Sequence, residues 1–488
     1  MNAQKNPPRP GGPQQKLTRG ASADTSQSAD SREAHILCAD GLDRALLKTG
    51  NPHPSHPHEA PRKANAAQTA NPREAAYQAL RAVGRERAYS NLVLKQSLGG
   101  LSNRDRALAS ALVYGVLSMR LRLDYILSQF CSLQKTKPAA LELLRLGAYQ
   151  IFCMDRIPQS AAVNETVRLS KKYAPALSGF INGVLRAACR GKNSVVYPKR
   201  EEGVARSLSV AYSFPEWLVN KWCKAYGEEC TEALLAASNR PAGTVIRANR
   251  LKIKPDELAK RLAKEEINLL PTPYENAFTV EGGLSLEDCE AYRDGLFTVI
   301  QTASMAACEA LEVKPGMRVL DMCAAPGGKT IYVAELMEDT GRLDAWDIHT
   351  HRVGLIEKNA ARMGLSCIHT ACRDAGEFDE SLSGAYDAVL LDAPCSGLGV
   401  IRQKPDIKWK DPDGFAALSE IQKRLAAAAV RYVKPGGRLV YCTCTLNRAE
   451  NEAVADNIEK SGMRRLTTRT LFPHIDETNG FFIAQFEK

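Results

Sequence analysis

Two cysteines follow segments that have the pattern of buried strands, and a thiol in such a position can act as a nucleophile. Cys395 lies in the turn Asp392-Ala393-Pro394-Cys395-Ser396-Gly397, after an expected strand over 386–391. Cys444 follows an expected strand over 438–442. A thiolate forms covalent adducts with electron-poor carbons, so each thiol is a candidate catalytic group. The spacing of the residues alone does not rank one thiol above the other.

The remaining cysteines favour ordinary packing roles. The chain has 14 cysteines, without a Cys-x-x-Cys pair or a cluster of cysteines and histidines at zinc spacing, so we expect neither a disulfide scaffold nor a metal site. Cysteine is commonly a small buried hydrophobe. We expect this role for Cys442, with its side chain pointing away from that of Cys444.

A loop of small residues is the candidate cofactor site. The expected strand 318–322 leads into Cys323-Ala324-Ala325-Pro326-Gly327-Gly328-Lys329 and then into a helix. Small residues let backbone N–H groups approach a ligand at the carboxyl edge of a parallel sheet. A phosphate-binding P-loop would require glycine at position 323, and the dinucleotide pattern Gly-x-Gly-x-x-Gly is absent. These two differences disfavour an ATPase and a dinucleotide enzyme.

Carboxylates follow the next two expected strands. Asp347 ends the strand over 343–347 and could accept both hydrogen bonds of a ribose diol, whereas Asp374 follows the strand over 366–370. Each could instead cap a helix. Their regular placement after successive strands favours a nucleoside-binding edge.

Methyl transfer to carbon 5 of a cytosine would use these groups together. Addition of a thiolate to carbon 6 turns the ring into an enamine, which can then take a methyl group from a sulfonium. Asp392 is the candidate for protonating or orienting the base near its N3, and Lys329 is a further catalytic candidate. We expect Cys395 to serve in the release step, when the carbon 5 proton must leave.

The elements that position these residues predict a multidomain fold. Residues 1–72 are rich in Pro, Gly, Ser, Asn and Gln and are expected to be a flexible arm, in which Cys38, His53, His56 and His58 are most simply bystanders. Residues 73–200 read as an all-helical bundle, with helix starts at Asn71-Pro72 and Ser102. Residues 201–296 read as a small α/β connector, with helices over 215–238 and 255–266 and strands over 244–248 and 277–280. Residues 297–488 alternate strands with helices, which predicts a Rossmann-like parallel sheet.

Charge is concentrated in the helical segment. Residues 73–200 carry 21 Lys and Arg against 7 Asp and Glu, a balance of +14, whereas residues 201–488 have a balance of −7. A solvated basic surface is the alternative, but binding of a polyanion is the better interpretation. The sequence shows no membrane span and no secretory signal, so a cytoplasmic protein that binds RNA is expected.

The motifs resemble the RNA 5-cytosine methyltransferase family often named Nol1/Nop2/Sun, over about residues 73–488. The resemblance rests on the loop 323–329, the turn 392–395, the pair Thr443-Cys444 and the segment Asn479-Gly480-Phe481-Phe482, with Arg247-Ala248-Asn249 and Gln301 as further matches. It implies S-adenosyl-L-methionine as cofactor, held by the loop 323–329 with Asp347, Asp374 and Asp392. It also implies that Cys444 is the nucleophile.

The helical segment resembles the RNA-binding NusB fold, which together with this catalytic domain implies small-subunit (16S) ribosomal RNA as the partner rather than DNA. The turn Ala371-Cys372-Arg373-Asp374 lacks the glycine found in relatives, so the resemblance supports Asp374 least. Two alternatives stay open. The same chemistry could act on transfer RNA, or the chain could be a non-catalytic RNA-binding assembly factor.

Overall fold

The computed structural model describes residues 71–86, 93–94, 97–282, 284–286 and 288–488. Residues 1–70, which include nearly all of the expected arm with its cysteine and histidines, lie outside this described part. Among the described residues, no helix has the length and apolar character needed to cross a membrane.

Among the described residues, five α-helices form the predicted helical bundle. They are α1 (Pro72–Glu86), α3 (Asn103–Ser128), α4 (Pro138–Cys153), α5 (Gln159–Tyr173) and α6 (Ser178–Arg190). Both predicted helix starts are confirmed. The Asn71 side chain accepts a hydrogen bond from the Arg73 amide at 2.9 Å, and Ser102 exchanges hydrogen bonds with Asp105. Each cap satisfies amide groups that the first turn of a helix leaves unpaired.

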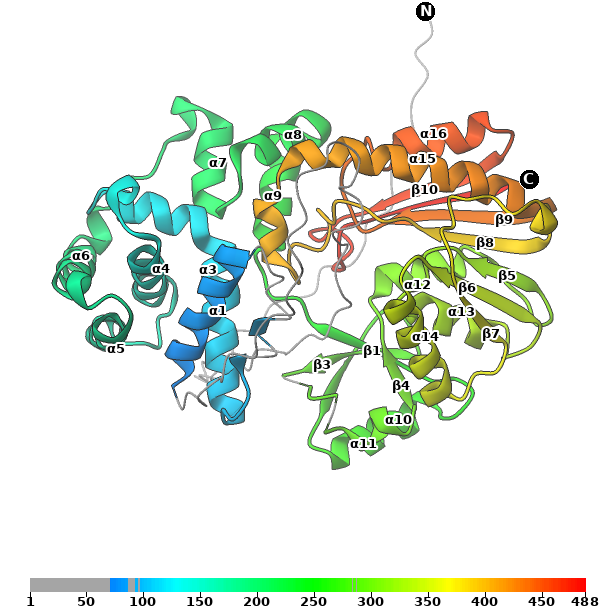
Figure 1. Cartoon of the computed structure of the whole chain (residues 1–488), viewed down its shortest axis with the longest axis horizontal. Helices are drawn as coiled ribbons and strands as arrows, with labels where there is room; N and C mark the ends of the chain where they lie inside the picture. Colours follow the sequence, from blue (N-terminus) through cyan, green and yellow to red (C-terminus); the bar gives the residue numbers. More distant parts are fainter. Residues whose placement is uncertain (1–70, 87–92, 95–96, 283, 287) are drawn as a thin grey trace, which may run out of the picture. The chain divides into compact units, whose positions relative to one another are not determined.

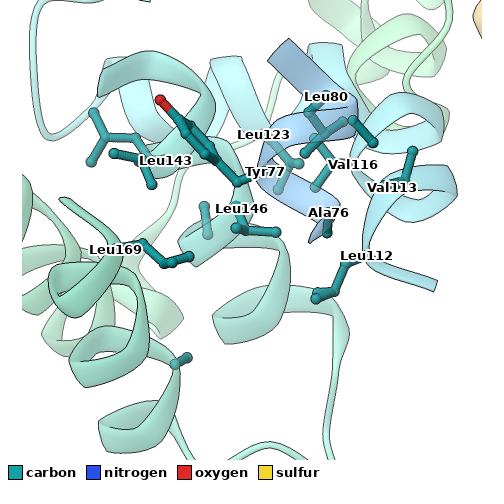
Figure 2. Packing of buried hydrophobic residues seen from close by; sticks show 14 of the residues in the cluster. Ala76, Tyr77, Leu80, Leu112, Val113, Val116, Leu123, Leu143, Leu146 and Leu169 are labelled. Carbon is teal, nitrogen blue, oxygen red and sulfur yellow. The ribbon is translucent and has the colours of Figure 1, made fainter. Parts of the chain in front are cut away.

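Apolar side chains at helical spacing build the core of the bundle (Figure 2). On α3, Leu112 and Val116 are buried, whereas Leu108 and Met119 are partly buried at the border of the same apolar stripe. Side chains from α1, α4, α5 and α6 join the cluster. Those of α1, α4 and α5 that Figure 2 labels are Ala76, Tyr77, Leu80, Leu143, Leu146 and Leu169. The stripe therefore packs inward, as expected for an amphipathic helix at the edge of a core.

Three short helices lead from the bundle into a small antiparallel sheet. They are α7 (Val204–Tyr212), α8 (Glu216–Tyr226) and α9 (Glu228–Ser238). The predicted single helix over 215–238 is wrong, because Gly227 interrupts it with a backbone φ of +85° that side-chain-bearing residues rarely adopt. The prediction also missed α7.

The small sheet has the strand order β2-β3-β1-β4. Its strands are β1 (Thr244–Ala248), β2 (Asn268–Pro271), β3 (Ala277–Glu281) and β4 (Phe297–Val299), accompanied by α10 (Pro255–Lys264) and α11 (Glu290–Arg293). The predicted strands over 244–248 and 277–280 are confirmed. The prediction missed β2 and β4, which have only four and three residues.

A seven-stranded sheet with the order β10-β11-β9-β8-β5-β6-β7 carries the cysteines and the cofactor loop. Its parallel strands are β5 (Arg318–Asp321), β6 (Arg342–Asp347), β7 (Ile368–Cys372), β8 (Tyr386–Asp392) and β9 (Val433–Thr443). The antiparallel strands β10 (Arg464–Leu471) and β11 (Phe481–Glu487) extend it beyond the prediction. From β5 the chain runs outward through β6 and β7, and it returns to the other side of β5 at β8. Open α/β sheets bind ligands at such a switch point.

Helices cover both faces of this sheet (Figure 1). One layer contains α12 (Thr302–Glu309), α13 (Gly328–Leu336) and α14 (Thr350–Met363), and the other contains α15 (Phe415–Tyr432) and α16 (Glu452–Lys460). On β8, Ala388 and Leu390 pack with the first layer, whereas Val389 and Leu391 pack with the second. This alternation confirms the Rossmann-like catalytic fold and leaves the ends of the strands free for function.

Candidate active site

The loop between β5 and α13 is held by its neighbours through backbone atoms. The amide of Ala324 donates to the Trp346 carbonyl of β6 at 2.8 Å. From α14, Arg352 donates to the Ala325 carbonyl and Asn359 to the Pro326 carbonyl, each at 3.0 Å. These contacts fix the path of the loop without using the side chains within it.

Asp321, the last residue of β5, is a functional candidate that the sequence reasoning missed. Its side chain is buried, and Thr330 donates to its Oδ2 at 2.7 Å. Its Oδ1 is buried without a hydrogen-bond partner among the described residues. Burial raises the pKa of this carboxyl to about 7. A spare acceptor beside the loop suits a polar ligand, and its place directly before the loop was the available signal.

Asp347 lies at the tip of β6, where both roles considered for it can be compared. Its Oδ1 accepts a hydrogen bond from the His349 amide at 3.0 Å, and its Oδ2 lies 3.4 Å from Arg352. The carboxylate therefore caps the approach to α14. Its second oxygen remains beside the arginine that also holds the loop.

The carboxylate of Asp374 makes closer contacts within the protein than that of Asp347 does. Its carboxylate accepts a hydrogen bond from the Gly376 amide at 2.8 Å and pairs with Arg424 of α15 at 2.9 Å. The Arg424 pair makes this the carboxylate least suited to a ligand. The departure of this turn from the family pattern led to the same ranking.

Lys329 and Asp392 form an ion pair between the cofactor loop and the end of β8. Lys329 Nζ lies 2.6 Å from Asp392 Oδ2. Burial opposes the charge of the lysine, but the adjacent carboxylate raises its pKa overall. The lysine is thus held as a cation, 5.5 Å from the centre of the Phe481 ring. This contact gives the terminal Phe481-Phe482 motif a place beside the site.

The two candidate thiols meet, although 49 positions separate them in the sequence. Their sulfur atoms are 3.3 Å apart, with Cys395 buried and Cys444 partly buried. The contact to Cys444, together with burial, raises the pKa of Cys395. The same contact, with help from Lys329 and Lys404, lowers the pKa of Cys444. These opposite shifts favour Cys444 as the thiol that loses its proton first.

Cys442 corrects one expectation. It is fully buried, as expected, but its sulfur donates to Asp392 Oδ1 at 3.5 Å, and it packs in the same cluster as Cys444. Residues two apart along a strand share a face, so its side chain does not point away from that of Cys444.

Glu450 holds the two cysteine loops together. Its carboxylate is fully buried and accepts hydrogen bonds from the Ser396 amide at 2.8 Å and hydroxyl at 2.5 Å. Gln422 of α15 and Asn447 donate to the same carboxylate. Ser396 directly follows Cys395, and Glu450 belongs to the loop after Cys444, so the carboxylate fixes one loop to the other. The sequence pattern had not given Glu450 this role.

Gly399 lies where three loops meet. Its amide donates to the Cys444 carbonyl at 3.0 Å, and its carbonyl accepts from the Gly480 amide at 2.8 Å. A Cβ atom at Gly399 would lie 1.9 Å from the Gly480 carbonyl oxygen and 2.8 Å from that of Cys444. The contact requires glycine at position 399, and it holds Gly480 against the cysteine loops.

The further family matches, Arg247, Asn249 and Gln301, lie at or near the junction between the small sheet and the catalytic domain. Arg247 of β1 forms a fully buried, bidentate ion pair with Glu335 of α13, at 2.5 and 2.6 Å. Asn249 donates to the carbonyls of Gly295 and Met363. Gln301 lies 3.5 Å from the Gly243 carbonyl. Arg247 and Asn249 thus anchor β1 to the helices that surround the cofactor loop.

Family models match three consecutive parts of the chain. Residues 70–190 match the NusB family, and residues 214–287 match a ferredoxin-like domain of RsmF/B-like methyltransferases. Residues 308–487 match the family described as 16S rRNA methyltransferase RsmB/F. The order of helical, ferredoxin-like and catalytic parts agrees with the predicted fold class.

Whole-length relatives support the same assignment. The chain is 37% identical to a probable ribosomal RNA small subunit methyltransferase B of Bacillus subtilis, over 85% of this chain and 98% of that protein. It is 33% identical to ribosomal RNA small subunit methyltransferase B of Pseudomonas putida, over 86% and 98%. The crystal structure of PH0851 aligns with a TM-score of 0.73 at 25% identity, over 86% of this chain and 99% of that one. The chain therefore belongs to the family of ribosomal RNA small subunit methyltransferases B.

Proposed function

We propose that this methyltransferase places a methyl group on carbon 5 of a cytosine in small-subunit ribosomal RNA, with Cys444 as the covalent nucleophile. The observation that carries the proposal is the pair of sulfur atoms 3.3 Å apart, a contact that lowers the pKa of Cys444 and raises that of Cys395. Carbon 5 of cytosine is a weak nucleophile until a thiolate adds to carbon 6, and the pair supplies that thiolate.

The methyl donor is S-adenosyl-L-methionine, which supplies an electrophilic methyl group when bound. The candidate binding residues are Cys323, Ala324, Ala325, Pro326, Gly327, Gly328 and Lys329 of the loop, with Asp347, Asp374 and Asp392. The spare Oδ1 of Asp321 and the carboxylate at the tip of β6 fit a nucleoside with polar groups at both ends. Of this set, Asp374 has the weakest claim because Arg424 already pairs with it.

Addition of Cys444 to carbon 6 moves an electron pair toward N3, which must then be neutralised. Asp392 accepts a hydrogen bond from Lys329 at 2.6 Å, so the proton of this pair is on the lysine. We assign neutralisation of N3 to the Lys329–Asp392 pair acting together, with Asp392 orienting the base. S-adenosyl-L-methionine, when bound, would supply the methyl group to carbon 5 and keep the electrons of the broken carbon–sulfur bond on its sulfur.

Release requires removal of the carbon 5 proton, after which the electrons of that bond expel the Cys444 thiolate. Cys395 is the candidate base, although its pKa is raised in the free enzyme. The contact with Cys444 is the largest cause of that shift, and adduct formation removes the negative charge on Cys444. Cys395 can then lose its own proton to solvent and accept the proton from carbon 5. Formation of the adduct would thus allow Cys395 to become the thiolate that accepts the carbon 5 proton.

The test supplies tritiated S-adenosyl-L-methionine with unmodified 16S ribosomal RNA or, separately, bulk transfer RNA. Bisulfite sequencing then locates any 5-methylcytosine. Label confined to a ribosomal cytosine is the expected result. Label in transfer RNA alone would keep the chemistry and refute the substrate, and cofactor binding without label in either RNA would favour the assembly factor.

Two variants test the cysteine roles. Cys444→Ala should abolish turnover, whereas Cys395→Ala should trap a protein–RNA adduct that migrates slowly on a denaturing gel. Cys153→Ala, which changes an exposed cysteine of the bundle, is the control and should behave as wild type. Full turnover by Cys444→Ala would refute the nucleophile, and normal turnover without adduct in Cys395→Ala would refute the release role.

A further inference from the structure

A surface hollow lies between the bundle helix α3, the start of α8 and the short helix η7 (Pro405–Trp409). Its volume is about 440 Å³, within the ~300–1,000 Å³ range of sites that hold small ligands. The lining includes two indoles, Trp217 and Trp409, and two partly exposed cationic side chains, Arg120 and Lys410. No residue among these belongs to the candidate active site.

The charge of the hollow favours an anionic occupant. Asp124 is the acidic residue of the lining, and both of its oxygens are bound by Arg145 at 2.7 Å. Arg120 and Lys410 therefore dominate the open part of the surface. The Arg120 guanidinium also lies 5.7 Å from the Trp409 ring centre, so a cation and an aromatic surface are presented together.

Buried contacts hold the walls of the hollow in place. Trp409 Nε1 donates to the Leu117 carbonyl of α3 at 3.0 Å. The fully buried Lys408 donates to the Ser118 carbonyl, the Ser213 carbonyl and Asn239 Oδ1 at 3.0, 3.2 and 2.7 Å. Each ammonium hydrogen thus has an acceptor, and η7 is fixed against α3 and the α7–α8 turn. A site whose walls are fixed in advance loses little entropy when it binds.

We propose that this hollow binds a single-stranded nucleotide of the RNA substrate, outside the target base, with its base on an indole and its phosphates at Arg120 and Lys410. Aromatic side chains interleaved with cations suit single-stranded nucleic acid, because every base offers a face for stacking. The segment that carries η7 begins directly after the Cys395 turn, so a nucleotide held here would help to position the strand near the thiols. This proposal rests on the proposed function, since it takes the substrate RNA as the occupant.

Tryptophan fluorescence gives a direct test. The chain has four tryptophans, of which Trp222 and Trp346 are 0% and 3% exposed, whereas the two in the hollow are partly exposed. Titration of the full chain with unmodified 16S ribosomal RNA should quench its emission in a saturable way. The double variant Trp217→Phe/Trp409→Phe should lose that quench and retain the emission of the buried pair. Equal quenching in the double variant, or tight RNA binding without quenching of the wild type, would overturn the proposal.

Salt dependence tests the phosphate contacts without changing an indole. Each phosphate contact to a single strand contributes a slope of about 0.7 to log K against log salt, so Arg120→Ala/Lys410→Ala should flatten the slope by about 1.4. Lys260→Ala/Lys264→Ala on α10 removes the same charge outside the hollow and should leave the slope nearly unchanged. An equal effect of the two double variants would refute a specific site.

The two proposals can fail separately. Methylation of RNA without quenching would support the proposed function and refute nucleotide binding in the hollow. Quenching with the predicted salt effect, but without methyl transfer to either RNA, would support nucleotide binding in the hollow and refute the proposed function.

Discussion

Replacement of Gly399 by alanine should disable the chemistry and leave the rest of the protein intact. Gly399 connects the Cys395 turn to the backbone of Cys444 and to Gly480. The new methyl group would lie 1.9 Å from the Gly480 carbonyl oxygen, and real Cβ contacts essentially never fall below 3.0 Å. The loops must therefore separate by at least about 1.1 Å (3.0 − 1.9).

That displacement sets the size of the effect. The hydrogen bonds of Gly399 to Cys444 and Gly480 would break, at about 1 kcal/mol each. A misplacement of about 1 Å among catalytic groups costs roughly 100-fold in rate. We therefore expect the single-turnover rate constant of methyl transfer to fall about 100-fold, which corresponds to about 2.7 kcal/mol of activation free energy. Cofactor affinity should change little, because the loop 323–329 is held by separate contacts with β6 and α14.

The assay is single-turnover methyl transfer, with cofactor affinity and thermal unfolding measured on the same preparation. Gly414→Ala is the matched control, since Gly414 lies in the same connection between β8 and α15 and an added Cβ would meet nothing within 4 Å. It should behave as wild type. Normal turnover by Gly399→Ala would refute the argument that this contact positions the thiols. Loss of cofactor binding would show that the damage extends beyond them.

Three further predictions follow from the buried contacts. Cys395→Ala removes the thiol contact that lowers the pKa of Cys444, so the pH of half-maximal alkylation of Cys444 should rise. Cys395→Ser keeps a hydrogen-bond donor and should raise this pH less. Alkylation is measured by peptide mass spectrometry, and an unchanged or lower midpoint in Cys395→Ala would contradict the assignment. Glu450→Gln should destabilise the catalytic domain by about 2–6 kcal/mol, because two of four donors lose an acceptor at ~1–3 kcal/mol each; an unchanged thermal midpoint would refute this. Arg247→Met should lower the free energy of unfolding by about 3–5 kcal/mol, because it leaves the buried Glu335 without its cationic partner. Adding Glu335→Leu should restore much of the thermal midpoint, and a double variant no more stable than Arg247→Met would contradict this explanation.

The sequence by itself determined the class of fold and the order of its parts. Helix starts at Asn71 and Ser102 carry their own signal, because a capping side chain lies within a few residues of the amide it satisfies. The alternation of strands and helices predicted a parallel sheet, and the loop 323–329 indicated its ligand-binding edge. Gly227 shows the limit of local patterns, because the helical periodicity on either side of it concealed the break between α8 and α9.

Only the tertiary structure showed that the two candidate thiols lie in contact. Spacing could not rank Cys395 and Cys444, because the pKa of each depends on a contact made across 49 positions. The role of Glu450 was equally invisible, since its partners come from three separate segments. Local propensities act over a few residues, whereas burial, charge and hydrogen bonding act through space. The sequence therefore named the candidate groups, and the packing of the sheet brought the two sulfur atoms within 3.3 Å of each other.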